Sequence, residues 1–318
     1  MTKLSVVATL YRSAAYIEEF CQRSAMAARS FAGDDFEIVL VNDGSPDDSL
    51  IRASQLAAQD DHIVVVDLSR NHGHHKAMMT GLSHARGDFV FLIDSDLEEQ
   101  PEWLQPFAEI MANEGCDVVY GVQKSRKGGI FERASGALFY RLLGSISDIE
   151  VPANMTVARL MTRRYVRALT RHREAELFMA GPWAATGFVQ RPHLVRKESL
   201  SPTTYTLRKK ISQLVNSVTS FSTAPLKLIF FSGCWIFGAS ALFSAYLVLN
   251  WLFMSRPPGG YTSLMVSVWL LGGLIIAFLG VIGMYLAKIY SETKGRPYSI
   301  VRGIFRNGAW QDDSGGEA

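Results

Sequence analysis

Short apolar runs alternate with longer amphipathic stretches over the first 121 residues. The apolar runs have the length and composition of buried strands, at 4–10, 36–41, 62–67, 88–93 and 116–121. The stretches between them have helical periodicity, at 13–31, 46–58, 73–85 and 101–114, and Ser45 is a candidate N-cap for the second. Strands alternating with helices predict a doubly wound α/β sheet, which binds ligands at the carboxyl ends of its strands.

Two much longer apolar runs, Leu228–Phe253 and Leu264–Tyr290, lie near the C-terminus. Each exceeds the roughly 20 residues that cross a bilayer core. Neither contains an acidic residue, and Lys288 is the only basic one. A pair of buried core helices is the alternative, but core helices of this length usually carry a polar stripe. The runs therefore predict a transmembrane helical hairpin over 227–290.

The segment before the first run, 207–221, has apolar residues at helical spacing beside Arg208, Lys209 and Lys210. This pattern favours an interfacial amphipathic helix over an ordinary surface helix, because it leads directly into the apolar run. The predicted order is an N-terminal α/β domain at 1–205, an interfacial helix at 206–226, two spans at 227–290 and a tail at 291–318. Residues 311–318 are expected to lack regular structure.

The distribution of charge predicts the orientation of the spans. The chain has 318 residues, 32 basic against 30 acidic, and this balance by itself says nothing about partners. No nucleic-acid partner is expected. Basic residues flank the two runs, at Arg208, Lys209, Lys210 and Lys227 before them and Lys294, Arg296, Arg302 and Arg306 after them, whereas the loop between the runs has only Arg256. The positive-inside rule predicts an integral protein of the inner or plasma membrane whose N-terminal domain and tail are cytoplasmic. Three cysteines and no signal peptide fit reduced cytosolic thiols.

An acidic motif, Asp94-Ser95-Asp96-Leu97-Glu98, follows the fourth predicted strand. Alternate residues of an extended segment point the same way, so Asp94, Asp96 and Glu98 are expected to face one cation. Hard oxygen ligands suit Mg²⁺ or Mn²⁺ bound together with a diphosphate. The alternative is a polar loop of solvated acids.

Two further polar clusters lie at predicted strand ends. Asn42-Asp43-Gly44-Ser45 follows the second strand, where a carboxylate can accept hydrogen bonds from a base or a ribose and Gly44 allows a tight turn. A helix-capping turn is compatible with the same residues. His72, His74 and His75 raise the alternative of a zinc site, but no carboxylate or cysteine has helpful spacing. Gly73 is instead expected to open a helix whose N-terminus faces phosphate.

These motifs carry a family resemblance. The segments 40–49, 68–73 and 93–102 match a known order and spacing, as do 118–122, 138–143, 159–164, 204–210, 219–226 and the two-run tail. The chain resembles family 2 glycosyltransferases of the GT-A fold. More narrowly, it resembles the polyisoprenyl-phosphate glycosyltransferases, the group of dolichol-phosphate mannose synthase and the bacterial undecaprenyl-phosphate sugar transferases.

The resemblance implies roles for residues at matching positions. The metal would bind Asp94, Asp96 and Glu98, where Glu98 replaces a frequent Gln. The nucleotide sugar would contact Thr9, Tyr11, Asp43, Arg70, Asn71, Lys76, Asp94 and Ser95. Basic residues past the fifth strand are candidates for the acceptor phosphate, namely Lys124, Arg126 and Arg133, with Lys197 or Arg196 in addition. Asp94, Asp96 and Arg126 are the expected catalytic residues.

The chain also departs from the family pattern at three places. Arg12 and Ser13 replace the acidic contact after the first strand, Val157 replaces an Asp often given the role of base, and Thr204 replaces a phosphate-binding Lys. A phosphate monoester is already anionic near neutral pH, because its second pKa is about 6, so a lipid phosphate acceptor needs no base. Glu174 or Glu176 is a candidate replacement base if one is needed.

The expected reaction is inverting sugar transfer from a UDP- or GDP-linked sugar to a polyisoprenyl phosphate at the cytoplasmic membrane face. Transfer to another membrane lipid or a lipid-linked glycan is a second enzymatic alternative. An inactive, membrane-anchored scaffold that binds nucleotide sugars is the alternative from another class. The sugar, the base, the exact lipid and the oligomeric state, including a homo-oligomer, are left open by the sequence.

Overall fold

The computed structural model describes residues 2–123, 154–174, 177, 179–197 and 260–312, with scattered positions between 226 and 249. The described residues belong to two units. One unit contains the described residues up to 197 and those from 296 onward. The other contains the described residues from 226 to 295, and each unit is considered by itself.

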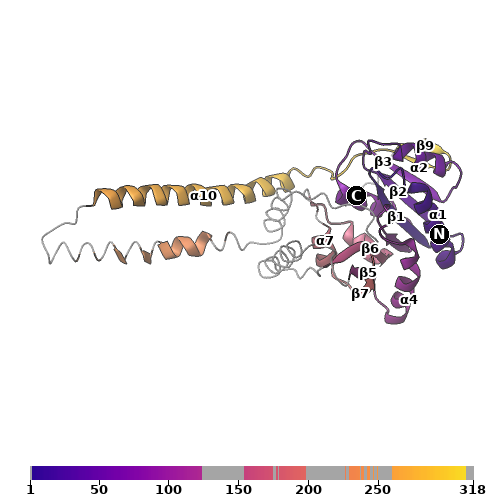
Figure 1. Cartoon of the computed structure of the whole chain (residues 1–318), viewed down its shortest axis with the longest axis horizontal. Helices are drawn as coiled ribbons and strands as arrows, with labels where there is room; N and C mark the ends of the chain where they lie inside the picture. The colour runs from indigo at the N-terminus through magenta and orange to yellow at the C-terminus, as the bar shows by residue number, and fades with distance from the viewer. Residues whose placement is uncertain are drawn as a thin grey trace. The chain divides into compact units, whose positions relative to one another are not determined.

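Within the first unit, nine strands of described residues form one mixed sheet in the order β7-β5-β6-β4-β1-β2-β3-β8-β9 (Figure 1). Their bounds are β1 Leu4–Leu10, β2 Phe36–Asn42, β3 Ile63–Leu68, β4 Phe89–Leu92, β5 Val118–Gln123, β6 Met155–Thr162, β7 Gln190–Val195, β8 Val301–Arg306 and β9 Ala309–Gln311. The four central strands β4, β1, β2 and β3 are parallel. β6 runs antiparallel to both β4 and β5, and β8 runs antiparallel to β3. The five predicted strands are confirmed, and the sheet is mixed rather than purely parallel.

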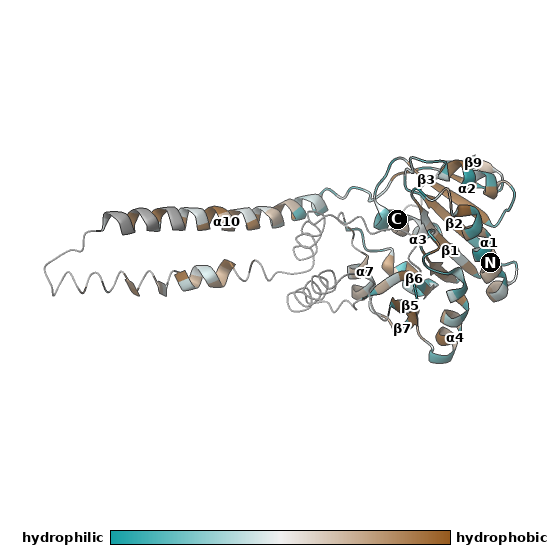
Figure 2. Cartoon of the chain, viewed as in Figure 1, coloured by the Kyte–Doolittle hydropathy of each residue, from teal (hydrophilic) through white to brown (hydrophobic). Residues whose placement is uncertain are grey.

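Helices cover both faces of this sheet. Their bounds are α1 Ile17–Ala32, α2 Ser49–Ala57, α3 His74–His84, η1 Pro101–Trp103, α4 Leu104–Glu114, α6 Arg163–Leu169 and α7 Ala180–Ala185. Side chains of α1, α2 and α4 share one apolar core with Val6 and Ala8 of β1, whereas α3, α6 and α7 share another with Val7. Because both faces are covered, every residue of β1, β2 and β3 is buried, and most of these residues are apolar (Figure 2).

Two helix starts differ from the prediction. Helix α2 begins after Asp48, because the hydroxyl of Ser45 is used elsewhere: it accepts the Arg12 backbone N–H at 2.8 Å and donates to Asp47. Helix α1 begins at Ile17 rather than at residue 13, because the residues before it form a turn in which Arg12 has φ 57°. Side chains in both turns tie the carboxyl ends of β1 and β2 together.

The C-terminal segment is the largest correction to the predicted domain order. Residues 291–318 were expected as a tail apart from the catalytic domain, yet β8 and β9 extend the sheet beyond β3. The guanidinium of Arg302 lies 3.1 Å from Asp67, and that of Arg306 lies 3.2 Å from the buried Glu37. The sequence pattern did not indicate these strands, because they are short and follow directly after a long apolar run.

The second unit contains the helix α10, Tyr261–Thr293, which matches the second predicted apolar run. Within its segment Leu271–Thr293, an 18-residue stretch has a mean hydropathy of 2.0, and among the described residues no other helix has the length and composition to cross a membrane. Figure 2 shows apolar residues along its length. Within the first predicted run, 229–236 are helical, but the rest of that run is only partly described. The hairpin therefore stays a prediction, and the amphipathic segment 207–221 lies outside the described residues.

We predict that Arg306→Ala lowers the thermal stability of the first unit. The Glu37 carboxylate is buried and also accepts the Ser5 hydroxyl and the Arg86 backbone N–H, both at 2.7 Å. Loss of the guanidinium leaves that charge without its cation, at a cost of about 2 kcal/mol. The melting temperature of the detergent-solubilised protein should fall by roughly 4–8 °C.

Arg52→Ala is the matched control. The ion pair of Arg52 with Glu18 is of similar length, 3.1 Å, but both side chains are largely exposed. Exposed pairs contribute little, so the melting temperature should change by less than about 2 °C. Equal effects of the two substitutions would contradict a structural role for the β8 contact.

Candidate active site

The candidate site lies where the parallel strands β4, β1 and β2 end. The last residues of these strands lie side by side: Leu10 of β1 pairs with Asn42 of β2, and Val7 of β1 pairs with Leu92 of β4. The polar residues that follow these strands therefore meet at one edge of the sheet. The loop from Ser69 to the start of α3 lies at the same edge, because β3 is parallel to β2 and ends beside it.

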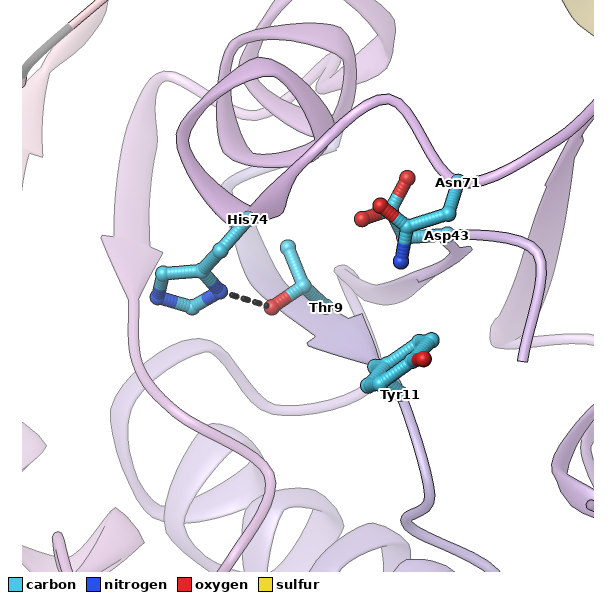
Figure 3. Close-up of a pocket in the computed structure, with 5 residues that line it drawn as sticks. All are labelled: Thr9, Tyr11, Asp43, Asn71 and His74. Atoms are coloured by element: carbon cyan, nitrogen blue, oxygen red, sulfur yellow. Dashed lines mark hydrogen bonds between the residues drawn. The ribbon is translucent and has the colours of Figure 1, made fainter. Parts of the chain in front are cut away.

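A cavity of about 210 Å³ opens at this edge, lined by Thr9, Tyr11, Asp43, Asn71 and His74. Figure 3 shows Thr9 between His74 on one side and Asp43 and Asn71 on the other, with the Tyr11 ring below. Four of the five were predicted to bind a nucleotide sugar, and His74 was not. The volume is below the roughly 300–1,000 Å³ of a complete small-molecule site, so this cavity fits one part of such a ligand.

Asp43 is held by the backbone of the neighbouring loop. Its carboxylate accepts the N–H groups of His72 at 2.7 Å and Gly73 at 3.1 Å, and burial raises its pKa. A carboxylate offers about four lone pairs, so two remain for a ligand. Gly44 follows with φ 58°, and a Cβ there would lie 2.5 Å from the Asn71 nitrogen. The predicted tight turn at Gly44 is confirmed, and its cause is the close approach of two backbones.

The acidic motif after β4 forms a turn instead of the extended segment that the alternation argument assumed. Leu97 has φ 59° and is buried, and the Asp96 carboxylate accepts the Glu98 backbone N–H at 3.0 Å. The turn brings Asp94 and Glu98 to a common neighbour, the ammonium of Lys197. Among the described residues, no three carboxylate, histidine or cysteine side chains converge into a preformed metal site.

Opposite charges surround Asp94. Its carboxylate lies 3.4 Å from His74 Nε2, while His74 Nδ1 is hydrogen-bonded to the Thr9 hydroxyl at 3.0 Å. Burial opposes ionisation of Asp94, but the hydrogen bond and charge of His74 hold the pKa of Asp94 below its usual value. Burial and the charge of Asp94 act together on Asp96 and raise its pKa. The negative charge of Asp94 is thus balanced by a neighbouring imidazole, whereas that of Asp96 is not balanced to the same degree.

Glu99 is a site residue that the sequence interpretation missed. It is 1% exposed, and its two carboxylate oxygens accept the backbone N–H groups of Val157 at 3.0 Å and Ala158 at 2.7 Å. Burial raises its pKa. A buried carboxylate therefore lies beside β6 at the position where the family Asp is replaced by Val157. Two consecutive acidic residues, Glu98 and Glu99, could have indicated it, but the sequence interpretation gave a metal-binding role only to Glu98.

The other predicted residues have varied positions. Ser95 donates to the Thr9 backbone carbonyl at 2.8 Å and so ties β4 to β1, while Arg70 and Lys76 belong to the β3–α3 segment but do not line the cavity. Glu174 lies 4.0 Å from His172. The remaining candidates lie outside the described residues: Lys124, Arg126, Arg133, Glu176 and Thr204.

The three histidines of the zinc alternative have separate partners. His72 Nε2 is hydrogen-bonded to the Ser69 hydroxyl and the Ile300 N–H, and His75 Nδ1 to the Leu177 carbonyl. His74 contacts Thr9 and Asp94 as described above. The three imidazoles thus form hydrogen bonds with different segments of the chain.

Comparison with known proteins identifies the family. The model of glycosyl transferase family 2 matches residues 5–170. The chain belongs to this family. A Mycobacterium tuberculosis protein described only as a glycosyltransferase is 46% identical over 303 residues, which cover 95% of this chain and 88% of the relative. A prophage-derived bactoprenol glucosyl transferase of Shigella flexneri is 35% identical over 272 residues, which cover 84% of this chain and 87% of that relative.

Solved structures are more distant. The glucosyl-3-phosphoglycerate synthase of Mycobacterium tuberculosis is 21% identical, with a TM-score of 0.47 over 69% of this chain and 80% of that one. Such a likeness does not bear on substrate. The family match and the mixed sheet together establish a GT-A-like α/β glycosyltransferase, and the chain is therefore an enzyme of sugar transfer.

We predict that Gly44→Ala disrupts the loop between β3 and α3. Both Gly44 and Gly115 have left-handed backbones, with φ 58° and 59°, so alanine at either costs about 1–2 kcal/mol. Only at Gly44 would the new Cβ meet backbone atoms, those of Arg70 and Asn71, whereas Gly115 has open space. Gly44→Ala should therefore speed amide hydrogen exchange at residues 70–73, and Gly115→Ala should not. Equal exchange in the two variants would contradict the proposed contact.

Proposed function

We propose that this glycosyltransferase transfers a sugar from a nucleotide diphosphate sugar to a polyisoprenyl phosphate at the membrane surface. The observation that carries the proposal is 35% identity over 84% of the chain to proteins named bactoprenol glucosyl transferases. The long apolar helix α10 supports it, because a lipid acceptor requires an enzyme at the bilayer.

In this proposal the nucleoside binds in the cavity beside Asp43. The carboxylate is fixed by two backbone N–H groups and accepts hydrogen bonds from the base or ribose through its remaining lone pairs. Asn71 and the half-exposed ring of Tyr11 line the cavity and would contact the same part of the donor. The diphosphate would then lie towards Asp94, which His74 connects to Thr9 of that cavity.

Asp94 and Asp96 are the residues proposed to hold Mg²⁺ or Mn²⁺. Their hard oxygens suit such ions, and the poorly compensated charge of Asp96 fits an added cation. Since no preformed three-ligand site exists among the described residues, donor phosphate oxygens would complete the coordination. When bound, the cation neutralises charge that develops on the leaving diphosphate.

The acceptor needs positioning more than activation. A lipid phosphate is already an anionic nucleophile near neutral pH, so the absence of a carboxylate side chain at Val157 does not prevent the reaction. The enzyme must hold that phosphate in line with the anomeric carbon. Lys124, Arg126 and Arg133 remain the residues we propose for this task.

A donor and acceptor panel tests the function. Purified protein in detergent is incubated with UDP- and GDP-linked sugars, Mg²⁺ or Mn²⁺, and a short polyprenyl phosphate, and products are identified by mass. We expect a polyprenyl-phosphate sugar from one donor. Transfer only to a neutral lipid or to a lipid-linked glycan would replace the proposed acceptor class, and hydrolysis alone would contradict the transfer.

Asp96→Asn should separate activity from stability. Asn retains the oxygen that accepts the Glu98 N–H but removes a charge that burial and Asp94 disfavour. The raised pKa means that the ionised form destabilises the fold near neutral pH, so neutralisation should leave the melting temperature unchanged or higher. Transfer should fall by roughly a hundredfold or more. Full activity, or a lower melting temperature with reduced activity, would contradict the assigned role; the exposed Asp61→Asn serves as the control.

Membrane topology is tested with single cysteines. In a Cys234→Ser background, where Cys21 and Cys116 are buried, we place Tyr261→Cys at the first residue of α10 or Asp312→Cys after β9. The positive-inside rule predicts that an impermeant maleimide labels Tyr261→Cys from outside intact cells and leaves Asp312→Cys unlabelled. The reverse pattern would show that the catalytic domain is not cytoplasmic.

A further inference from the structure

Lys197 occupies an unusual position for a residue expected to bind the acceptor phosphate. It follows β7, far along the chain from the acidic turn after β4. Its ammonium nevertheless lies 3.3 Å from Glu98, 3.7 Å from Glu99 and 3.9 Å from Asp94. All four side chains are largely shielded from solvent, with Lys197 the most exposed at 23%. One ammonium thus contacts three carboxylates.

The carboxylates of this cluster favour the charged form of Lys197. Burial opposes its charge, but Glu99, Asp94 and Asp96 raise the pKa of the ammonium above its usual value. The cluster still has four carboxylates, including Asp96, against Lys197 and the imidazole of His74. Lys197 therefore supplies much of the positive charge that keeps Asp94 and Glu98 close together when no donor is bound.

The same carboxylates include a proposed ligand of the divalent cation. An ammonium and a divalent ion cannot both sit against the same oxygens without strong repulsion. Lysine is suited to an exchange of partners, because its charge is carried on a flexible four-carbon stem with three rotatable donors. A cation that arrives alone must displace Lys197, whereas one that arrives with a diphosphate also brings anions to receive the displaced ammonium.

We propose that Lys197 is a built-in competitor of the divalent cation, which keeps the acidic site closed to free metal until the donor diphosphate enters. The inference rests on the proposed metal-dependent donor binding and adds its regulation. It assigns Lys197 to the donor side of the site rather than to the acceptor. It predicts that the cation binds weakly by itself and enters the site together with the donor.

The primary test measures Mn²⁺ binding without any nucleotide, from the electron paramagnetic resonance signal of free Mn²⁺. Full-length protein in detergent is compared with Lys197→Met, Lys197→Arg and the control Lys3→Met, at the opposite end of β1. Removing the competitor should tighten Mn²⁺ binding by about tenfold or more. Lys197→Arg keeps the cation and should bind Mn²⁺ as weakly as the unchanged protein does, and so should Lys3→Met. Equal or weaker binding by Lys197→Met would overturn the proposal.

A second measurement needs no substitution. Lys197 in the unchanged protein is acetylated with acetic anhydride over a Mn²⁺ titration, and its labelling is read by mass spectrometry against that of Lys3. Displacement by Mn²⁺ should release Lys197 from its carboxylates and raise its labelling severalfold, while Lys3 stays constant. Labelling of Lys197 that is constant or falls would overturn the proposal even if the variant does not fold.

The two proposals fail in different ways. If the inference is wrong, Mn²⁺ affinity is unaffected by Lys197→Met although sugar transfer to a polyprenyl phosphate is observed. If the proposed function is wrong, no donor yields a polyprenyl-phosphate sugar, whatever the Mn²⁺ measurements show. Because Mn²⁺ binding and acetylation are read without donor or acceptor, their outcome does not depend on the identity of the sugar or lipid.

Discussion

The crowding of four carboxylates after β4 is the constraint to which the rest of the site responds. Asp94, Asp96, Glu98 and Glu99 lie within six residues, and a buried carboxylate is costly unless it is paired or hydrogen-bonded. The fold supplies a different partner for most of them. β6 presents two backbone N–H groups to Glu99, α3 presents His74 to Asp94, and the segment after β7 presents Lys197.

This arrangement explains why β6 and β7 matter for the chemistry although neither contributes a predicted catalytic side chain. An antiparallel strand between β4 and β5 brings the amides of Val157 and Ala158 under the acidic turn. The parallel pairing of β7 with β5 then directs the chain towards Lys197. In this way a locally unfavourable concentration of charge is stabilised by elements distant in sequence, and Asp96 is left with the weakest compensation.

The sequence predicted the parallel half of the sheet well, because β1, β2 and β3 are buried on both faces and appear as continuous apolar runs. Polar residues at strand ends are a local signal, so the sequence placed Asp43 and Asp94 at one edge of the sheet, whereas Asn71, which lines the cavity with Asp43, was indicated by the family resemblance. The sequence interpretation missed β6, β7, β8 and β9, whose place depends on long-range pairing. It assigned Lys197 to a phosphate for the same reason: nothing in the neighbourhood of residue 197 in the sequence indicates the acids that it contacts in the fold.

The C-terminal strands extend this argument to the donor side. The loop from Ser69 to Gly73 borders the cavity and fixes Asp43 through two backbone N–H groups. That loop is in turn held by residues that follow α10: the Ile300 carbonyl accepts the Ser69 N–H at 2.9 Å, and Arg302 donates to the Ser69 carbonyl at 2.7 Å. The Ile300 N–H also faces the His72 imidazole. Asp43 therefore depends on residues far from it in the sequence, which the pairing of β8 with β3 brings beside the loop that holds its carboxylate.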